Sequence, residues 1–439
     1  MDAPAISVGI LIDKEISFSF HTPYIYTLTG EFLMGEQRAL FIDNHIYFKG
    51  KKSTNLYFEP ASTDAFFELH QVVIGKNFHW ERREDQRFKG GLELVATEEG
   101  ILAINEIDLE EYLVSVISSE MRATSSKEFL KAHAVISRSW LLAQIRKNIY
   151  LTEKKDKYQS VYQDNDHFIR WYDREDHTMF DVCADDHCQR YQGISRASTP
   201  LVEEAVRETC GEVLMYAGEI CDARFSKCCG GVSEVFETCW EPEPHPYLQA
   251  VRDSLEETVV PDLSGEEEIR KWIESEPEAY CHTHDKTILQ EVLNNYDQET
   301  TDFYRWEVEY SQEELAGLLH KNNQGFFFGL ILDLIPLKRG ASGRIEELKI
   351  VGSDRTMVIG KELEIRYALS ETHLYSSAFV VDKLAMQGGV PGRFRLRGAG
   401  WGHGVGLCQI GAAVMSAHGS RYDEILKHYY KGIQLIKQY

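Results

Sequence analysis

Glu120 is the residue whose position most directly suggests acid–base chemistry. Four apolar residues before it recur at intervals of three and four, as on one face of a helix: Leu109, Leu113, Val116 and Ile117. The same spacing carries Glu120 onto this face at the end of the helix. Because burial disfavours an ionised carboxylate, a Glu in this position can keep its proton near neutral pH and act as a general acid. The alternative is a carboxylate at a frayed helix end, in water or paired with Arg138.

Two consecutive helices must position this carboxylate. Asp108 followed by Glu111 predicts the start of the first helix, because a side-chain oxygen satisfies a free N–H and negative charge suits the N-terminal end. Ser125 followed by Glu128 predicts a capping box for the second helix. The second helix is apolar on most sides, which is typical of a helix central to a core. Arg138 lies on it, so we expect a partner for its guanidinium group.

The segment 177–193 gathers side chains that suit zinc. It contains His177, Cys183, His187 and Cys188. Thiolates and imidazoles are the usual zinc ligands, so the segment is a candidate metal site. The spacing is not the common CxxC pattern, however, and Cys183 and Cys188 could instead form a disulfide or stay reduced in a core.

The nine cysteines are an odd number in a long chain, which excludes a small disulfide-stabilised scaffold. Seven of them lie close together in the sequence: Cys183, Cys188, Cys210, Cys221, Cys228, Cys229 and Cys239. This clustering favours a metal site or a local disulfide. Cys281, His282 and His284 form a second, weaker candidate cluster in a polar region.

His403 lies in a turn of closely spaced glycines. These are Gly398, Gly400, Gly402, Gly404 and Gly406. The turn lacks the Lys-Ser/Thr of a phosphate-binding loop and does not match the dinucleotide pattern. Such glycines permit a tight backbone close to a bulky group. The His at the centre is therefore either a site residue or one that orients the loop. A small-residue helix closed by Gly419 follows, and we expect Ser420 to cap a last helix.

Composition limits the function classes. A hydrophobic content of 43% in 439 residues predicts a packed globular protein of two or three domains, or one domain with insertions. The net charge of −23 argues against nucleic-acid and anionic-lipid partners. No apolar run is long enough for a transmembrane helix, and the first residues do not resemble a signal peptide. We therefore expect a protein that stays inside the cell or a sequence that begins after a removed leader.

The chain as a whole predicts an α+β fold. Short alternating apolar segments make residues 1–104 β-rich. Residues 105–253 form a helical core that carries an insertion at 147–186. Residues 254–303 are a second insertion, acidic and helical. Residues 304–439 are mixed and end with the glycine-rich turn and two helices.

Several collinear segments resemble the SpoIID/LytB family of bacterial cell-wall metabolism. They are LEEYLVSVISSEM, EFLKAHAVISRSW, HCQRYQG, FSKCCGGVSE, ASGRIEELKIVG and GAGWGHGVGLCQIG. The resemblance extends from about Val8 to the last helix and implies one family domain over residues 1–439. The chain departs from the family pattern at His133, where Gln is usual, and at Cys408, where Ser is usual.

The resemblance implies a lytic transglycosylase. Its catalytic acid would be Glu120, the Glu of the family's EM motif, acting on the bond between N-acetylmuramic acid and N-acetylglucosamine. The sugar's own C6 hydroxyl would then close a 1,6-anhydro end, on strands stripped of stem peptides. One carboxyl can serve as acid and then as base, so no second carboxylate is needed. Four further residues are implied to bind or orient the substrate: Arg138, His403, Gln409 and Ser226.

The resemblance also implies zinc near Glu120, with His177, Cys183, His187 and Cys188 as its ligands. LytB-like members are described as amidase enhancers, so the alternative function is a non-catalytic protein that binds the cell wall or a wall amidase. A third possibility is a zinc-stabilised interaction protein inside the cell. For the first two, the family implies glycan strands as partner and the cell envelope or periplasm as location.

Overall fold

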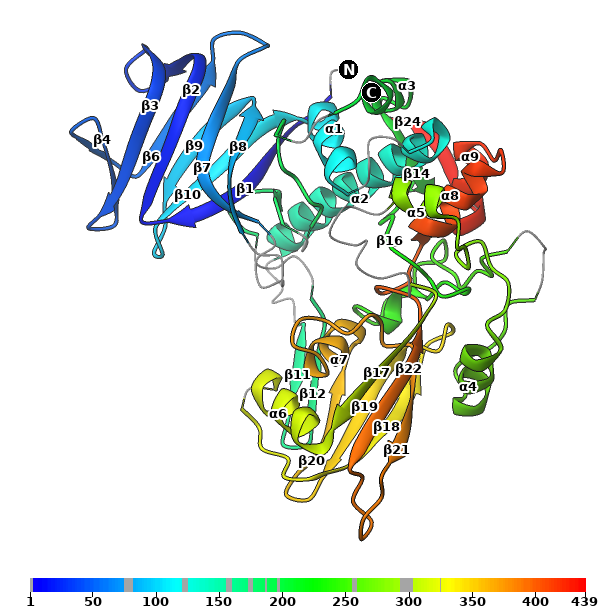
Figure 1. The fold of residues 1–439 in the computed structure, drawn as a ribbon. Helices are drawn as coiled ribbons and strands as arrows, with labels where there is room; N and C mark the ends of the chain where they lie inside the picture. Colours follow the sequence, from blue (N-terminus) through cyan, green and yellow to red (C-terminus); the bar gives the residue numbers. More distant parts are fainter. Residues whose placement is uncertain are drawn as a thin grey trace. The chain divides into compact units, whose positions relative to one another are not determined.

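The computed structural model describes residues 3–74, 82–120, 125–154, 160–172, 177–185, 188–195, 198–254, 259–292, 303–323 and 325–439. The chain forms two compact units (Figure 1). Unit 1 comprises Met1–Ile145, Glu175–Val213 and Ile436–Tyr439, and unit 2 comprises Arg146–Arg174 and Leu214–Leu435. Both units mix helices with sheets, so the predicted α+β class is confirmed.

Unit 1 is built on a sheet of 11 strands, which confirms the β-rich N-terminal region. The strands are β1 (Ala5–Asp13), β2 (Glu15–Tyr26), β3 (Glu31–Ile42), β4 (His45–Phe48), β5 (Lys51–Ser53), β6 (Asn55–Pro60), β7 (Phe66–Ile74), β8 (Arg82–Lys89), β9 (Gly91–Ala96), β10 (Ile101–Asp108) and β13 (Val182–Cys183). Their order is β13-β1-β10-β9-β6-β2-β3-β4-β5, and β7 pairs with β2 and β8. Alternate side chains face one side, where Phe18, Phe58 and Phe67 are fully buried.

The two predicted helices follow this sheet as α1 (Leu109–Glu120) and α2 (Lys127–Lys154). Asp108 caps α1, since its Oδ1 accepts hydrogen bonds from the N–H groups of Glu110 (2.8 Å) and Glu111 (3.3 Å). The predicted cap of α2 is one residue early, because Ser126 directly precedes the helix and its Oγ accepts from the N–H of Phe129 at 3.4 Å. The apolar stripe of α1 is fully buried as predicted, and each such side chain contributes about 1.5–3 kcal/mol.

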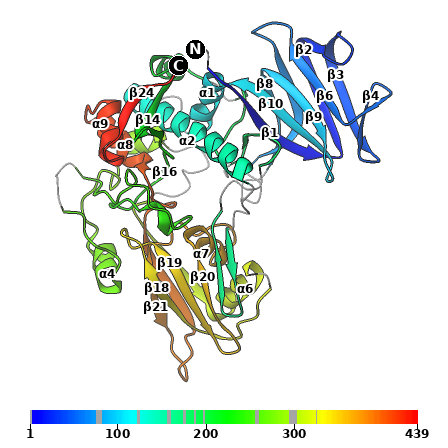
Figure 2. The same ribbon diagram turned by 180° about the vertical axis from the view of Figure 1, so that it is seen from behind.

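The two largest sheets of unit 2 have five and three strands (Figures 1 and 2). Buried residues of both sheets form one apolar core. The five-stranded sheet has the order β11 (Val161–Gln163), β12 (His167–Arg170), β20 (Thr356–Gly360), β19 (Ile345–Gly352) and β18 (Ile331–Arg339). The three-stranded sheet has the order β17 (Arg305–Ser311), β22 (Arg393–Ala399) and β21 (Phe379–Leu384). Two helices, α6 (Gln312–Asn322) and α7 (Glu362–Ala368), pack on the sheets through Leu319 and Ile365. The predicted insertion 147–186 thus contributes β11 and β12 to a sheet of unit 2.

The remaining elements are short. They are α3 (Pro200–Glu208), β14 (Glu212–Tyr216), β15 (Glu219–Ile220), β16 (Phe225–Ser226), a 3₁₀ turn (Phe236–Thr238), α4 (Glu266–Ser275), α5 (Lys286–Val292), β23 (Leu407–Cys408), α8 (Gln409–Ala417), α9 (Tyr422–Tyr429) and β24 (Gln434–Lys437). The acidic insertion is helical as predicted, through α4 and α5. Gly419 follows α8 with a φ of 93°, as expected for a helix end, whereas Arg421, not Ser420, precedes α9. Within the described ranges, no helix has the length and apolarity needed to cross a membrane.

Candidate functional site

Glu120 is the last residue of α1, and its side chain is half-buried. One carboxylate oxygen, Oε1, accepts a hydrogen bond from the backbone N–H of Arg190 at 2.9 Å. The segment around Arg190 runs along α1, because Gln192 donates its N–H to Ser115 Oγ at 3.3 Å and Gln189 Oε1 accepts from the Tyr112 hydroxyl at 3.3 Å. The carboxylate is therefore held against a segment far from it in the sequence.

Tyr112 connects Glu120 with the predicted metal ligands. Its buried ring stacks on that of Tyr191, with centroids 5.1 Å apart. Burial raises the pKa of Tyr112 well above its usual value, and Cys188, Cys183, Tyr191 and Glu120 raise it further. The two cysteines and the Glu120 carboxyl group therefore all influence the titration of this one tyrosine.

Three of the predicted zinc ligands converge. The ligand atoms of His177, Cys183 and Cys188 all lie within 4.8 Å of one another, and all three residues are half-buried. His187, the fourth predicted ligand, lies outside the described residues. One imidazole and two thiols fit three corners of a tetrahedral zinc site. The residues present therefore fit the metal that the sequence suggested.

The backbone of β13 fixes this cluster on the large sheet. Cys183 pairs with Gly9 of β1, and the N–H of Ala184 donates to the Gly9 carbonyl at 3.0 Å. A side chain on Gly9 would meet the ring of Phe180 at 2.6 Å, and this ring in turn packs on His177 with centroids 4.8 Å apart. A larger residue at position 9 would therefore displace the Phe180 ring that packs on His177.

Arg138 has the partner that its buried position demands, but the partner is Glu110. Arg138 Nε and Nη2 donate to the two Glu110 oxygens at 2.8 and 2.6 Å. Nη1 donates to the carbonyl of Glu212 at 3.0 Å. Glu110 Oε1 also accepts from the N–H of Gly211 at 3.3 Å and from the Tyr439 hydroxyl. The guanidinium thus joins α1, α2 and the chain end, rather than pairing with Glu120.

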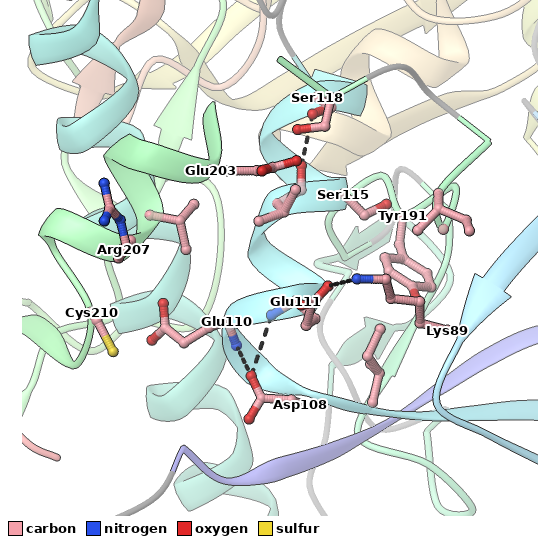
Figure 3. A pocket seen from close by; sticks show the side chains of 16 residues that line it. Lys89, Asp108, Glu110, Glu111, Ser115, Ser118, Tyr191, Glu203, Arg207 and Cys210 are labelled. Carbon is pink, nitrogen blue, oxygen red and sulfur yellow. Dashed lines mark hydrogen bonds and ion pairs between the residues drawn. The ribbon is translucent and has the colours of Figure 1, made fainter. Parts of the chain in front are cut away.

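A cavity of about 670 Å³ runs along the outer face of α1 (Figure 3). Ser115 and Ser118 of α1 line it between Glu203 and Arg207 of α3 on one side and Tyr191 on the other. At the end of the cavity away from Ser118, Lys89 Nζ and Glu111 Oε2 form an ion pair at 2.9 Å. Glu120 itself does not line the cavity, which reaches Ser118 two residues before it.

The other predicted site residues belong to unit 2 and gather around the glycine turn. Ser226 of β16 pairs with Cys408 of β23, next to Gln409. A side chain on Gly402 would meet the Cβ of Ser226 at 3.3 Å, so the turn passes directly over this serine. Both Ser226 and Gln409 are buried, and Ser226 Oγ has no hydrogen-bond partner within the described ranges.

His403 holds its own turn. Its Nδ1 accepts the N–H of Val405 at 3.0 Å, and its ring packs edge-on against Trp240 with centroids 4.9 Å apart. Burial lowers the pKa of His403 well below its usual value, and Arg224, Arg344 and other guanidinium groups add to this effect. The imidazole is thus neutral. Of the two predicted roles, these contacts fit loop orientation.

The second candidate cluster does not form as predicted. His282 stacks on Tyr304, with centroids 4.2 Å apart. Within the described ranges, Cys281 shares its ligand cluster with two other cysteines and an aspartate, and not with His282 or His284. All nine cysteines are free thiols, so no disulfide links Cys183 to Cys188.

Comparison with known proteins identifies the helical core. The family model of the stage II sporulation protein SpoIID matches residues 97–216, which include α1, α2 and the zinc-type cluster. Stage II sporulation protein D of Bacillus subtilis is 25% identical over 76% of this chain and 76% of its own length. Residues 97–216 of this chain therefore belong to the SpoIID family.

Other relatives extend the SpoIID match. An uncharacterized protein of Brachyspira hyodysenteriae is 24% identical over 80% of this chain and 72% of its own length. An amidase enhancer of Bacillus subtilis is 25% identical over 74% of this chain but 40% of its own length. A domain of unknown function, DUF8618, matches residues 234–406 and thus lies within unit 2.

Sequence reasoning missed three partners in the SpoIID core: Tyr112, Arg190 and Glu110. Tyr112 had a signal, because Tyr112, Val116 and Glu120 follow one another at intervals of four along a helix face. Arg190 contributes through its backbone N–H, which side-chain identity does not encode. Glu110 is one of two adjacent acidic residues, and only the packing of α2 shows which one meets Arg138.

Proposed function

We propose that this SpoIID-family protein acts on the bacterial cell wall as a lytic transglycosylase that cleaves the glycan backbone of peptidoglycan, with Glu120 as the catalytic acid. The observation that carries the proposal is the placement of Glu120 at the end of a buried helix within the SpoIID-matched segment. Its Oε1 is fixed by the N–H of Arg190, so the carboxyl group has a defined orientation. We place its action in the cell envelope, where its substrate lies.

The surroundings of Glu120 supply reasons for it to hold a proton. It lies at the C-terminal end of α1, where the helix dipole is negative and disfavours a second negative charge. Partial burial acts in the same direction. The hydrogen bond from Arg190 acts in the opposite direction, and its main contribution is to orient the carboxyl group.

The chemistry needs one carboxyl group. Protonated Glu120 gives its proton to the oxygen between N-acetylmuramic acid and N-acetylglucosamine, and the bond from C1 to this oxygen breaks with its electron pair leaving on the oxygen. The C6 hydroxyl of the muramic acid residue attacks C1. Glu120, now ionised, takes the hydroxyl proton. The products are a 1,6-anhydro end and a free hydroxyl, and Glu120 is protonated again.

The cavity along the outer face of α1, which we call the groove, is the proposed glycan site. Its lining combines serine hydroxyls with charged groups of α3 and with Lys89 and Glu111, which suits the hydroxyl and amide groups of an amino sugar chain. Ser118 marks the end of the groove nearest Glu120. A strand that lies along α1 would bring a glycosidic bond toward the catalytic carboxyl group.

We also propose that His177, Cys183 and Cys188 bind zinc. Bound there, zinc supplies a rigid link and positive charge between β13 and the 188–193 segment, which carries the Arg190 N–H. The chain's own residues carry out the acid–base steps. Loss of the link would release the segment that orients Glu120.

The amidase enhancer relative supports a second candidate, a non-catalytic protein that binds glycan or a wall amidase. One experiment separates the candidates. The purified protein is incubated with glycan strands that carry or lack stem peptides. The masses of the products are then measured by mass spectrometry. We expect anhydro-ended fragments, chiefly from bare strands. Reducing ends would indicate hydrolysis, and intact strands that still bind the protein would favour the enhancer.

A further inference from the structure

Four ligand-bearing side chains from four separate segments of unit 2 meet at one buried point. They are Cys229, Asp253, Cys281 and Cys408, and their exposed fractions are 0–2%. One ligand atom from each lies within 4.8 Å of those of the other three. The sulfur atoms of Cys229 and Cys281 are 3.6 Å apart.

The segments that carry the thiols are held by backbone contacts. Cys408 ends β23, which pairs in parallel with β16 just before Cys229. The N–H of Cys229 donates to Cys408 Sγ at 3.2 Å. Cys281 belongs to the acidic insertion and donates its N–H to Asp253 Oδ2 at 2.9 Å. Backbone pairing and N–H hydrogen bonds therefore hold the segments that carry these thiols close to one another.

Asp253 is oriented toward this point by a second set of contacts. The hydroxyl of Tyr429, a residue of α9, donates to Asp253 Oδ1 at 2.6 Å. A side chain on Gly411 of α8 would lie 2.5 Å from the same oxygen, so the helix leaves the space that the carboxylate occupies. Hydrogen bonds of this kind to a ligand carboxylate are typical of metal sites.

We propose that Cys229, Cys281, Cys408 and Asp253 bind one zinc ion in a closed, structural site of unit 2. Zinc takes four ligands in a tetrahedron, with Zn–S distances of about 2.3 Å, which places neighbouring sulfur atoms about 3.8 Å apart. The sulfur separation of 3.6 Å matches this value. A set of thiolates with one carboxylate suits zinc better than the hard cations Mg²⁺ and Ca²⁺.

A disulfide accounts less well for the same residues. One bond would use two of the three ligand thiols and leave the third, together with the neighbouring Cys228 thiol, beside a buried carboxylate without a cation. A zinc ion engages all four groups and offsets their charge. The guanidinium of buried Arg344 adds positive charge nearby, since its Nη1 donates to the Cys229 carbonyl at 3.4 Å.

The site would attach the acidic insertion to the rest of unit 2. Cys281 supplies the insertion's ligand, Cys408 lies between the glycine turn and α8, and Asp253 contacts α9. A zinc ion at this point would hold three parts of the C-terminal region together. Removing it would loosen these three parts of unit 2.

The test is the zinc content of the whole chain, which is purified with reductant and without chelator. The zinc is quantified by elemental mass spectrometry. The measurement starts from a Cys183→Ser variant, which removes the His177, Cys183 and Cys188 site from the count. We expect this variant to retain one equivalent of zinc and the further change Cys281→Ser to remove it. Cys221→Ser, which changes a buried thiol outside the cluster, is the matched control and should leave the zinc content unchanged.

A second measurement does not depend on the folding of Cys281→Ser. Cobalt(II) loaded into Cys183→Ser should give the intense near-ultraviolet absorption of thiolate–cobalt bonds and the visible bands of tetrahedral cobalt. Zinc content below a tenth of an equivalent in Cys183→Ser, without these bands, would overturn the proposal. A mass two hydrogens lower, with Cys229 linked to Cys281 in peptides, would overturn it in favour of a disulfide. Because both measurements report on unit 2 metal alone, they are independent of glycan cleavage.

Discussion

Arg138 and Glu110 form a bidentate ion pair between the two central helices, with N–O distances of 2.8 and 2.6 Å. The Arg138 side chain is fully buried and that of Glu110 is 16% exposed. Planar, doubly hydrogen-bonded pairs of this kind are the strong ones. The pair therefore fixes α1, whose last residue is Glu120, against α2.

Breaking this pair should destabilise the protein strongly. Glu110→Gln or Arg138→Met leaves a buried charge without its partner, which costs about 3–5 kcal/mol. We expect a fall of this size in the free energy of unfolding measured with urea. Lys271→Met removes the exposed partner of Glu267 and is the control, with an expected change below about 1 kcal/mol. Equal effects of the two changes would contradict the role given to Arg138.

Zinc at the SpoIID-matched cluster should depend on His177 and Cys183. Replacing either residue removes one of three converging ligands, and losing such a ligand strongly weakens binding. We expect His177→Ala to lose one equivalent of zinc and to slow glycan cleavage, because the Arg190 segment loses its anchor. Cys221→Ser changes a buried cysteine outside both the cluster and the groove and should do neither. Full zinc content in His177→Ala would exclude His177 as a ligand.

Acid should destabilise unit 2 through His373. Burial lowers the pKa of His373 to about 4, and the nearby Arg366 charge adds to the effect. The folded state therefore keeps this imidazole neutral, while the unfolded state takes up a proton below pH 6.5. Stability present above pH 6.5 is lost as the pH falls from 6.5 to 4, by up to about 2 kcal/mol. The pH dependence of unfolding should be shallower in His373→Phe over this range, and an unchanged slope would contradict the assignment.

His403 should matter for the turn more than for the reaction. His403→Ala leaves the N–H of Val405 without its acceptor, which costs about 1–3 kcal/mol for a buried group. We expect lower unfolding stability with little change in kcat for the folded fraction. A large loss of kcat at unchanged stability would instead give His403 the substrate-binding role that the sequence also allowed.

Sequence patterns predict those parts of the site whose residues lie close together in the chain. The stripe from Leu109 to Ile117 predicted α1 and the place of Glu120, because helical periodicity is a property of neighbouring residues. The cluster of His177, Cys183 and Cys188 could be predicted because its residues lie within one short segment. Capping residues were placed within one position, since adjacent serines such as Ser125 and Ser126 compete for the same role.

Pairings between distant segments could not be read in this way. Cys229 is 52 residues from Cys281 and 179 from Cys408, and no periodicity links them. Sequence distance alone groups Cys281 with its neighbours His282 and His284, although its partners in the structure lie elsewhere in the chain. Nor does the polar segment after α2 reveal that β12 pairs with β20, since strand partners depend on the whole sheet.

The rate at which Glu120→Gln forms 1,6-anhydro ends on bare glycan strands, compared with that of Glu267→Gln, tests the role of Glu120 as the acid most directly. Both changes replace a carboxylate by an amide, but Glu267 is an exposed residue of α4 that pairs with Lys271 at 2.6 Å and does not line the groove. The rate is measured by mass spectrometry. We predict a fall of at least about a hundredfold for Glu120→Gln and a change below about threefold for Glu267→Gln. Anhydro ends formed at the unaltered rate by folded Glu120→Gln would contradict the assignment of Glu120 as the acid.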